Sequence, residues 1–295
     1  AARGGSTNPQ PLPSPPPARE AAAGGARPPP PMGGADELLA LLPEASVLAG
    51  AQVAIFGPCL AVTRAWWPSH KDPWTLADTI ASIVLYPLLL WHAFRGVMEL
   101  RHDVESRWFG LTDASRHFQV FYVTRSTLHL GVLCMQRLKH HELCLMIFHH
   151  CITVFAMTSG LVLRNCHYWA CLNGCCEVTN VFLNNVWLFK EVTIKGLTLQ
   201  DHLPRLYIVN GFLLWLSYIV FRLLLFSYWL YSWYNDTTIW KDLTWERISN
   251  YERYFYASVT VSLLVLSTMW FYRITVGLLK AVSAGASAPS KARSE

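Results

Sequence analysis

Two adjacent histidines, His149 and His150, lie within an apolar stretch that is long enough to cross a bilayer. The next apolar stretch carries Glu177, Asn180 and Asn184. Polar and ionisable side chains are costly at membrane depth, so they usually face a cavity or a partner and mark a functional site. A desolvated imidazole is neutral and can act as a general base or as a transient acyl acceptor. The His pair therefore predicts a buried reactive site.

The residue types around the His pair suggest a division of roles. One histidine would act as the base or acyl acceptor, Glu177 would orient it, and Asn180 would donate a hydrogen bond to the oxyanion of an acyl transfer. Consecutive residues of a helix project about 100° apart. We therefore expect one histidine to line the cavity and the other to hold a neighbouring helix or to make a supporting hydrogen bond. An alternative stays open, in which all these groups only hydrogen-bond helices together.

A further set of polar side chains is expected to line the same cavity. A rise of about 1.5 Å per residue places most of them in one layer that opens toward the cytosolic half of the membrane. Arg125 and His129 share a helix face at i, i+4 spacing, as do His149 and Thr153. Arg222 lies deepest, and we expect it to snorkel to the far interface or to pair with a helix carbonyl. The set consists of Arg125, His129, Thr153, Asn184, Asn210 and Arg222.

These side chains need membrane helices to position them. The chain is 53% hydrophobic and only 15% charged, which is typical of a membrane protein rather than a soluble one. A spanning helix needs about 20 mostly apolar residues. The sequence contains seven such runs, so we predict an all-α membrane protein with seven transmembrane helices in one polytopic domain. The predicted spans are residues 45–63, 74–94, 118–136, 143–163, 166–189, 206–233 and 254–279.

The regions before and after the main helical domain have distinct compositions. Residues 1–37 are rich in Pro, Ala and Gly, with ten of the 17 prolines before residue 35, and are predicted to be disordered. Residues 38–71 would form the first transmembrane helix and its loop. Residues 281–295 would form a short basic cytosolic tail, in which Lys291 and Arg293 lie near the spacing of an endoplasmic-reticulum retrieval signal.

Lys and Arg in the short loops predict the orientation. The loops after the third and fifth spans carry more of them than the loop after the fourth, which favours an outside N-terminus and a cytosolic C-terminus. The loop after the sixth span would then be lumenal, and it holds an N-x-T glycosylation acceptor at Asn235. Tryptophans near the predicted span ends, among them Trp108, Trp229 and Trp233, are expected to anchor in the interface.

Composition also argues against several function classes. Basic residues are scattered among acids, which does not indicate a nucleic-acid surface. The eight cysteines form no CxxC pair, so neither zinc-type nor redox-type spacing is present, and no metal site or bound cofactor is predicted. The expected partner is a membrane lipid or a fatty acyl chain, and the oligomeric state is left open.

The polar residues resemble a known pattern. His149-His150-Cys-Ile-Thr153, followed by Glu177-Val-Thr-Asn180 and Asn184, and then by Asn210-Gly211 with Arg222, is similar to the TLC-domain family, which includes ceramide synthases. The resemblance covers residues 72–280. It implies a barrel of six helices around a central cavity, here with one extra N-terminal helix, in the endoplasmic reticulum. It also implies a role in membrane lipid homeostasis.

The resemblance to ceramide synthases is incomplete. Where that branch has His-Asp and then a second Asp, this chain has Cys176-Glu177 and Asn180, so it is more similar to members that are not established ceramide synthases. We therefore expect lipid or acyl-chain handling, with acyl-CoA as the co-substrate if the protein is an acyltransferase. The alternative is a protein that binds, senses or transports lipid without catalysis. A seven-helix receptor is disfavoured, because the last span ends in Trp270-Phe-Tyr-Arg273 instead of a receptor signature.

Overall fold

The computed structural model describes residues 34–136 and 140–287, most of which are helical. The long helices are α1 (Gly34–Trp66), α2 (Pro73–Leu100), α4 (Asp113–Met135), α5 (His140–Leu163) and α11 (Asn250–Ser287). The shorter α-helices are α3 (Val104–Phe109), α6 (His167–Gly174), α7 (Val178–Glu191), α8 (Leu199–His202), α9 (Pro204–Tyr218) and α10 (Leu225–Ile239). The remaining elements are the 3₁₀ turns η1 (Cys175–Glu177) and η3 (Lys241–Leu243), the π-helix η2 (Ile219–Leu224), and the antiparallel strands β1 (Thr193–Ile194) and β2 (Leu197–Thr198).

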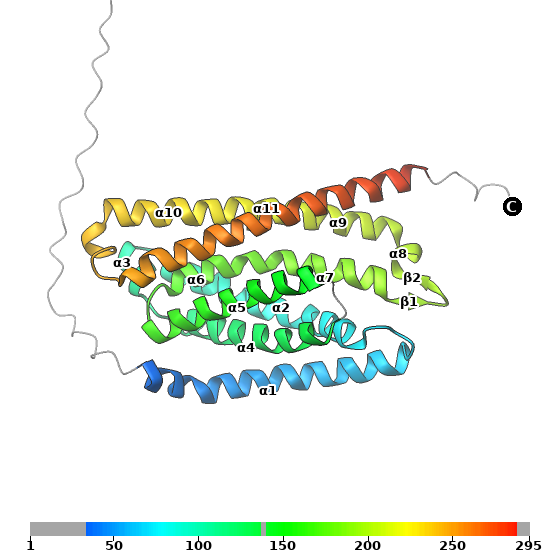
Figure 1. Cartoon of the computed structure of the whole chain (residues 1–295), viewed down its shortest axis with the longest axis horizontal. Helices are drawn as coiled ribbons and strands as arrows, with labels where there is room; N and C mark the ends of the chain where they lie inside the picture. Colours follow the sequence, from blue (N-terminus) through cyan, green and yellow to red (C-terminus); the bar gives the residue numbers. More distant parts are fainter. Residues whose placement is uncertain (1–33, 137–139, 288–295) are drawn as a thin grey trace, which may run out of the picture.

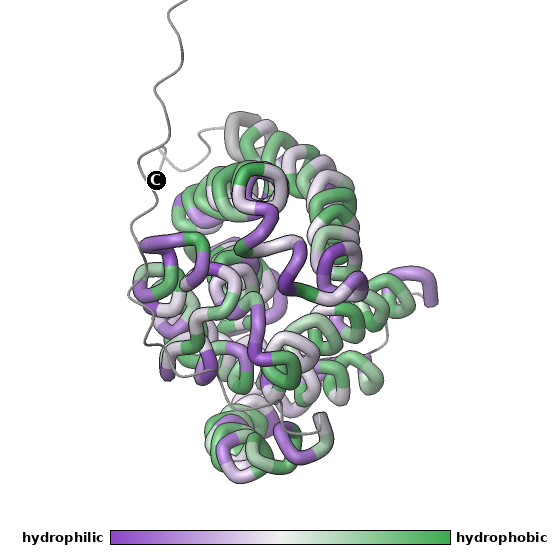
Figure 2. The backbone as a smooth tube through the Cα atoms, turned by 90° about the vertical axis from the view of Figure 1, so that its left-hand side faces the viewer, coloured by the Kyte–Doolittle hydropathy of each residue, from purple (hydrophilic) through white to green (hydrophobic). Residues whose placement is uncertain are grey.

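The long helices form an elongated bundle (Figure 1). The short helix α3 lies at one end of the bundle, and the β1–β2 hairpin with α8 lies at the other. Helix α1 runs along the outer side of the bundle and packs against α2 and α4. Seen end-on, the bundle carries apolar residues on its outer helices (Figure 2), and many large hydrophobic side chains are exposed. Such a surface suits contact with lipid.

Five of the described helical segments are long and apolar enough to span a bilayer. They are α1, α2, α5, the continuous segment Pro204–Ile239 and the segment Asn250–Ser283. These helices support an integral, multi-pass membrane protein. The predicted spans 118–136 and 166–189 correspond to α4 and to the α6–η1–α7 segment, which are more polar or interrupted. The count of seven spans and the closed barrel stay predictions.

Local sequence accounts for the starts of two helices. The carboxylate of Asp72 accepts a hydrogen bond from the backbone N–H of Thr75, with Pro73 in the first turn of α2. Pro204 likewise occupies the first turn of α9.

The first and last helices extend into the two terminal segments that were predicted to lie outside the helical domain. Helix α1 begins at Gly34, so the last residues of the segment 1–37 are helical, and the others lie outside the described residues. Helix α11 continues to Ser287, into the predicted tail 281–295. Lys291 and Arg293 lie outside the described residues.

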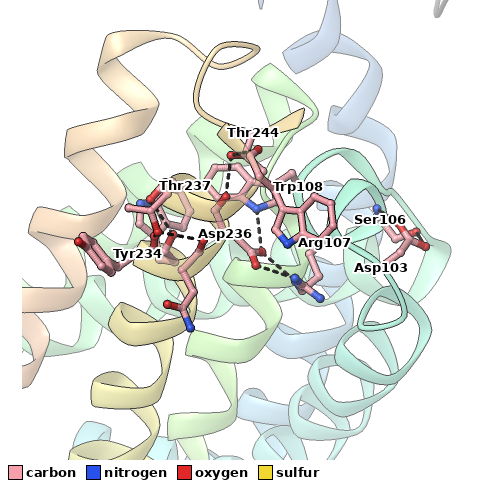
Figure 3. A network of polar contacts seen from close by, with 12 residues as sticks. Asp103, Ser106, Arg107, Trp108, Tyr234, Asp236, Thr237 and Thr244 are labelled. Atoms are coloured by element: carbon pink, nitrogen blue, oxygen red, sulfur yellow. Dashed lines mark hydrogen bonds and ion pairs between the residues drawn. The ribbon is translucent and has the colours of Figure 1, made fainter. Parts of the chain in front are cut away.

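Four tryptophans form a buried cluster at the α3 end of the bundle. Trp229 and Trp233 stack with ring centroids 4.7 Å apart, and Trp108 and Trp169 pack against Trp233. The prediction that Trp108, Trp229 and Trp233 anchor in the lipid interface is therefore wrong, because the protein buries their side chains. Two of them have polar partners inside the protein, which lowers the cost of burial: the indole N–H of Trp108 donates to Asp236 (Figure 3), and that of Trp229 donates to the Trp169 carbonyl.

Candidate functional site

A cavity of about 390 Å³ lies among α2, α4, α5, α7, the α9–η2 segment and α11. Its wall includes Gln136, His141 and Glu142, so it reaches the end of the bundle where α4 ends and α5 begins. This is the end at which the sequence predicted the polar layer to open. The predicted residues that line the cavity are Arg125, His129, His149, His150, Glu177, Asn180, Asn184 and Arg222.

Two of the predicted residues do not line this cavity. Thr153 donates back to the carbonyls of His149 and His150, at 3.0 and 3.1 Å, and lines an adjoining space of about 30 Å³. Asn210 is buried between α7 and α9, where its amide donates to the Phe182 carbonyl at 3.0 Å and accepts from Asn185 at 3.2 Å. Asn210 therefore joins two helices by hydrogen bonds, which is the alternative that the sequence left open for these polar groups.

Both histidines of the pair line the same cavity. Their ring centroids lie 5.2 Å apart, with His149 packed against Trp270 of α11 and His150 packed against His129 of α4. The expectation that only one of them would reach the cavity is therefore wrong, because the cavity is wide enough to accept both directions. The Nδ1 atoms of both rings are buried and have no hydrogen-bond partner among the described residues. Unpaired buried nitrogens are costly unless a ligand or water pairs with them.

Glu177 is buried but is not bonded to the His pair. Its carboxylate accepts a hydrogen bond from the amide of Asn180 and a weaker one from the thiol of Cys176. Within the described part of the chain, no hydrogen bond joins Glu177 to His149 or His150. The reason is local: η1 separates α6 from α7 at Glu177, and Asn180 follows three residues later on the same face. No hydrogen bond among the described residues therefore supports the predicted role of Glu177 in orienting a histidine of the pair.

Arg222 takes neither of the positions expected from its depth. It lies in the π-helix η2, is only 4% exposed, and lines the cavity. Its Nε–H donates to the Thr179 hydroxyl at 3.1 Å, and its guanidinium lies over the Tyr218 ring. π-Helical turns inside longer helices often occur at functional sites. Here the turn places a cation in the cavity wall.

A buried carboxylate of this cavity, Asp78 on α2, was missed by sequence reasoning. It accepts two hydrogen bonds from Arg125, each 2.9 Å, and its Oδ2 atom lies 2.8 Å from Nδ1 of His129. Asp78 was a detectable signal, since it is an acid inside the apolar span 74–94. Its partners come from another helix, so local spacing could not identify them.

The rest of the wall is largely apolar and aromatic. It includes Leu89, Leu133, Leu145, Met146, Leu183, Trp187 and Ile274. An apolar pocket with a few convergent polar groups suits a ligand that combines a hydrocarbon chain with a polar or reactive end. Among the described residues, no group of three or more His, Cys, Asp or Glu side chains is placed to hold a metal ion.

Comparison with known proteins gives one result. The family model described as the TLC domain matches residues 45–276, which includes most of α1 and nearly all of the region 72–280. Neither a curated protein nor a solved structure matches the chain.

Proposed function

Because the chain belongs to the TLC-domain family, we propose that it binds a lipid or a fatty acyl chain in this cavity and transfers an acyl group from acyl-CoA through the His pair. The observation that carries the proposal is the pair itself: the buried imidazole of His149 and the half-buried imidazole of His150 line one largely apolar cavity, and neither Nδ1 atom has a hydrogen-bond partner among the described residues. A neutral imidazole without a fixed partner is available as a nucleophile or base.

The first half of the reaction follows from these groups. A ring nitrogen of one histidine attacks the thioester carbonyl, the carbon–sulfur bond breaks, and the CoA thiol leaves with the proton that the imidazole gives up. Arg222 is better placed than Asn180 to stabilise the oxyanion, because the amide of Asn180 is engaged with Glu177, whereas no hydrogen bond in the described structure occupies the terminal nitrogens of Arg222.

The cellular setting belongs to the same proposal. The protein would reside in the endoplasmic reticulum and contribute to membrane lipid homeostasis, with its C-terminus in the cytosol. The cavity reaches the end of the bundle that this orientation turns toward the cytosol, where acyl-CoA is available.

A second candidate function is lipid binding, sensing or transport without turnover. The observation in its favour is the absence, within the described residues, of a hydrogen bond between Glu177 and the His pair. In this version the polar groups recognise the head of a lipid, and the histidines do not react.

The test uses the purified protein in lipid nanodiscs with palmitoyl-CoA as the probe. Acyl transfer predicts release of free CoA thiol together with a mass increase of one palmitoyl group on the protein, and it predicts that His149→Asn or His150→Asn abolishes both. His117→Asn is the matched control, because His117 is half-exposed on α4 and does not line the cavity. Retention of palmitoyl-CoA by the wild-type protein, without thiol release, would replace acyl transfer by the binding function.

A further inference from the structure

The cavity contains a carboxylate–imidazole contact that the acyl transfer described above does not use. Oδ2 of Asp78 lies 2.8 Å from Nδ1 of His129. A carboxylate that is paired with a guanidinium is ionised and can only accept hydrogen bonds, so Nδ1 of His129 is the donor. In the neutral form of the ring, this contact leaves the free electron pair on Nε2, and His129 lines the cavity.

Asp78 does not need His129 to balance its charge. Arg125 already pairs with both carboxylate oxygens, at 2.9 Å each, and the same guanidinium also donates to the Ser82 hydroxyl at 2.7 Å. The additional contact therefore serves the imidazole: it fixes the tautomer and the direction of the ring. An acid that orients an imidazole in this way is the arrangement that prepares a histidine to act as a base.

His129 also lies beside the reactive pair. The ring centroids of His129 and His150 are 5.0 Å apart, and both side chains line the cavity. When an alcohol attacks an acyl-imidazole, the alcohol loses a proton and the departing imidazole must gain one. A base next to that imidazole can accept the first proton and return it.

We propose that His129 is the general base of this cavity and that Asp78 is the residue that positions it, an inference that rests on the proposed acyl transfer. The hydroxyl oxygen of the acceptor bonds to the acyl carbon held on His150, and the hydroxyl proton moves to Nε2 of His129. The bond between the acyl carbon and the ring nitrogen of His150 breaks, and His129 passes its proton to that nitrogen. Both imidazoles end neutral, so atoms and charge balance with the acyl-imidazole and the alcohol alone.

The experiment separates the two halves of the reaction. The full chain in nanodiscs is acylated with labelled palmitoyl-CoA, freed of the excess, and mixed with hexadecanol as the acceptor, and the acyl-protein that remains is measured over time. The variant is His129→Asn, because an Asn amide can still donate to Asp78 but has no second nitrogen that could accept a proton. The control is His117→Asn on the same helix.

We expect His129→Asn to be acylated as fully as the wild type but discharged by hexadecanol about 10²–10⁴-fold more slowly, the usual contribution of a general base. Hydroxylamine, a strong nucleophile that needs no base, should discharge both proteins at similar rates, which shows that the acyl group is still accessible. The control variant should behave as the wild type.

The outcomes are distinguishable. Discharge of His129→Asn at the wild-type rate overturns the assignment of the base and leaves the acyl transfer standing. Loss of acylation in His129→Asn, with the wild type acylated, also overturns it, because the base would then act earlier or only support the fold. A wild-type protein that is never acylated removes the proposed function and this inference together.

Discussion

Arg107 of α3 and Asp236 of α10 are joined by two hydrogen bonds, 2.9 Å from Nε and 2.6 Å from Nη2 of the guanidinium (Figure 3). Asp236 also accepts the indole N–H of Trp108 at 3.0 Å, so the carboxylate connects α3 to the end of α10. Replacing it should weaken the α3 end of the bundle without touching the cavity. This relationship gives the first prediction.

Asp236→Asn should lower the free energy of unfolding by about 1.5–3 kcal/mol, because it removes the negative charge and one of the two oxygens that accept hydrogen bonds from the Arg107 guanidinium. Glu105→Gln is the control, since its pair with Arg247 is exposed on both sides and should be worth at most about 1 kcal/mol. The measurement is the thermal unfolding midpoint of the purified protein in detergent. Equal midpoints for the two variants would contradict the prediction.

The second prediction concerns the buried pair of Asp78 and Arg125. Asp78→Ala leaves the Arg125 guanidinium buried without a counter-ion and should cost about 3–5 kcal/mol of stability. The double variant Asp78→Leu/Arg125→Met removes both charges and should recover much of that loss. Thermal unfolding of the single and double variants at matched detergent concentration checks this. If the double variant were less stable than Asp78→Ala, the unpaired charge of Arg125 would not be the main cause of the stability lost in the single variant.

The third prediction concerns a glycine next to the site. A Cβ atom at Gly174 would overlap the ring of Phe118, which is fully buried. Gly174→Ala should therefore destabilise the protein by about 1–3 kcal/mol. Because Gly174 directly precedes η1, the variant should also displace Glu177 and reduce ligand binding in the cavity.

Gly131→Ala is the matched control on α4. A Cβ atom there meets nothing within 4 Å, so this change should be neutral or should stabilise the helix by up to about 1 kcal/mol. Unfolding midpoints and palmitoyl-CoA binding are measured on both variants. A loss in Gly174→Ala alone indicates overpacking at Phe118, whereas a similar loss in both variants would contradict the prediction.

The fourth prediction concerns the glycosylation acceptor. Asn235, Asp236 and Thr237 lie inside α10 rather than in a loop, and the Thr237 hydroxyl is buried against the carbonyls of Trp233 and Tyr234. We expect Asn235 to stay unmodified in cells even with this end of the bundle in the lumen. A gel-mobility assay with and without a glycosidase measures this.

An Asn-Gly-Thr acceptor in a flexible insert after the exposed Glu246 provides the control, and it should be modified. A modified Asn235 would contradict the helical placement. An unmodified insert would place this end of the bundle in the cytosol and reverse the predicted orientation.

The sequence predicted the His pair and six other polar residues of the cavity wall because the cost of polar groups at membrane depth is a local property of each helix. Arg125 and His129, or Glu177 and Asn180, share a helix face through spacing alone. Spacing carries no information about partners on other helices. It therefore could not pair Asp78 with His129, and it could not tell that Asn210 is used between α7 and α9.

Two other differences have a similar origin. The Trp residues near span ends looked interfacial, but Trp108, Trp229 and Trp233 pack with Trp169 across α3, α6 and α10, which only the folded chain brings together. The 3₁₀ turn η1 interrupts an apolar run without an obvious sequence signal, yet Glu177 lies in this turn, so the turn sets the position of its carboxylate.

The π-helix η2 fixes the rotational phase between the two halves of one long helix. On its N-terminal side, α9 must present Asn210 to α7, and on its C-terminal side, α10 must present Trp229 and Asp236 to α6 and α3. Each residue of a helix adds about 100° of rotation. Removing a single residue from Ile219–Leu224 would thus turn one half away from its partners, so the packing at both ends of the bundle constrains the length of this segment.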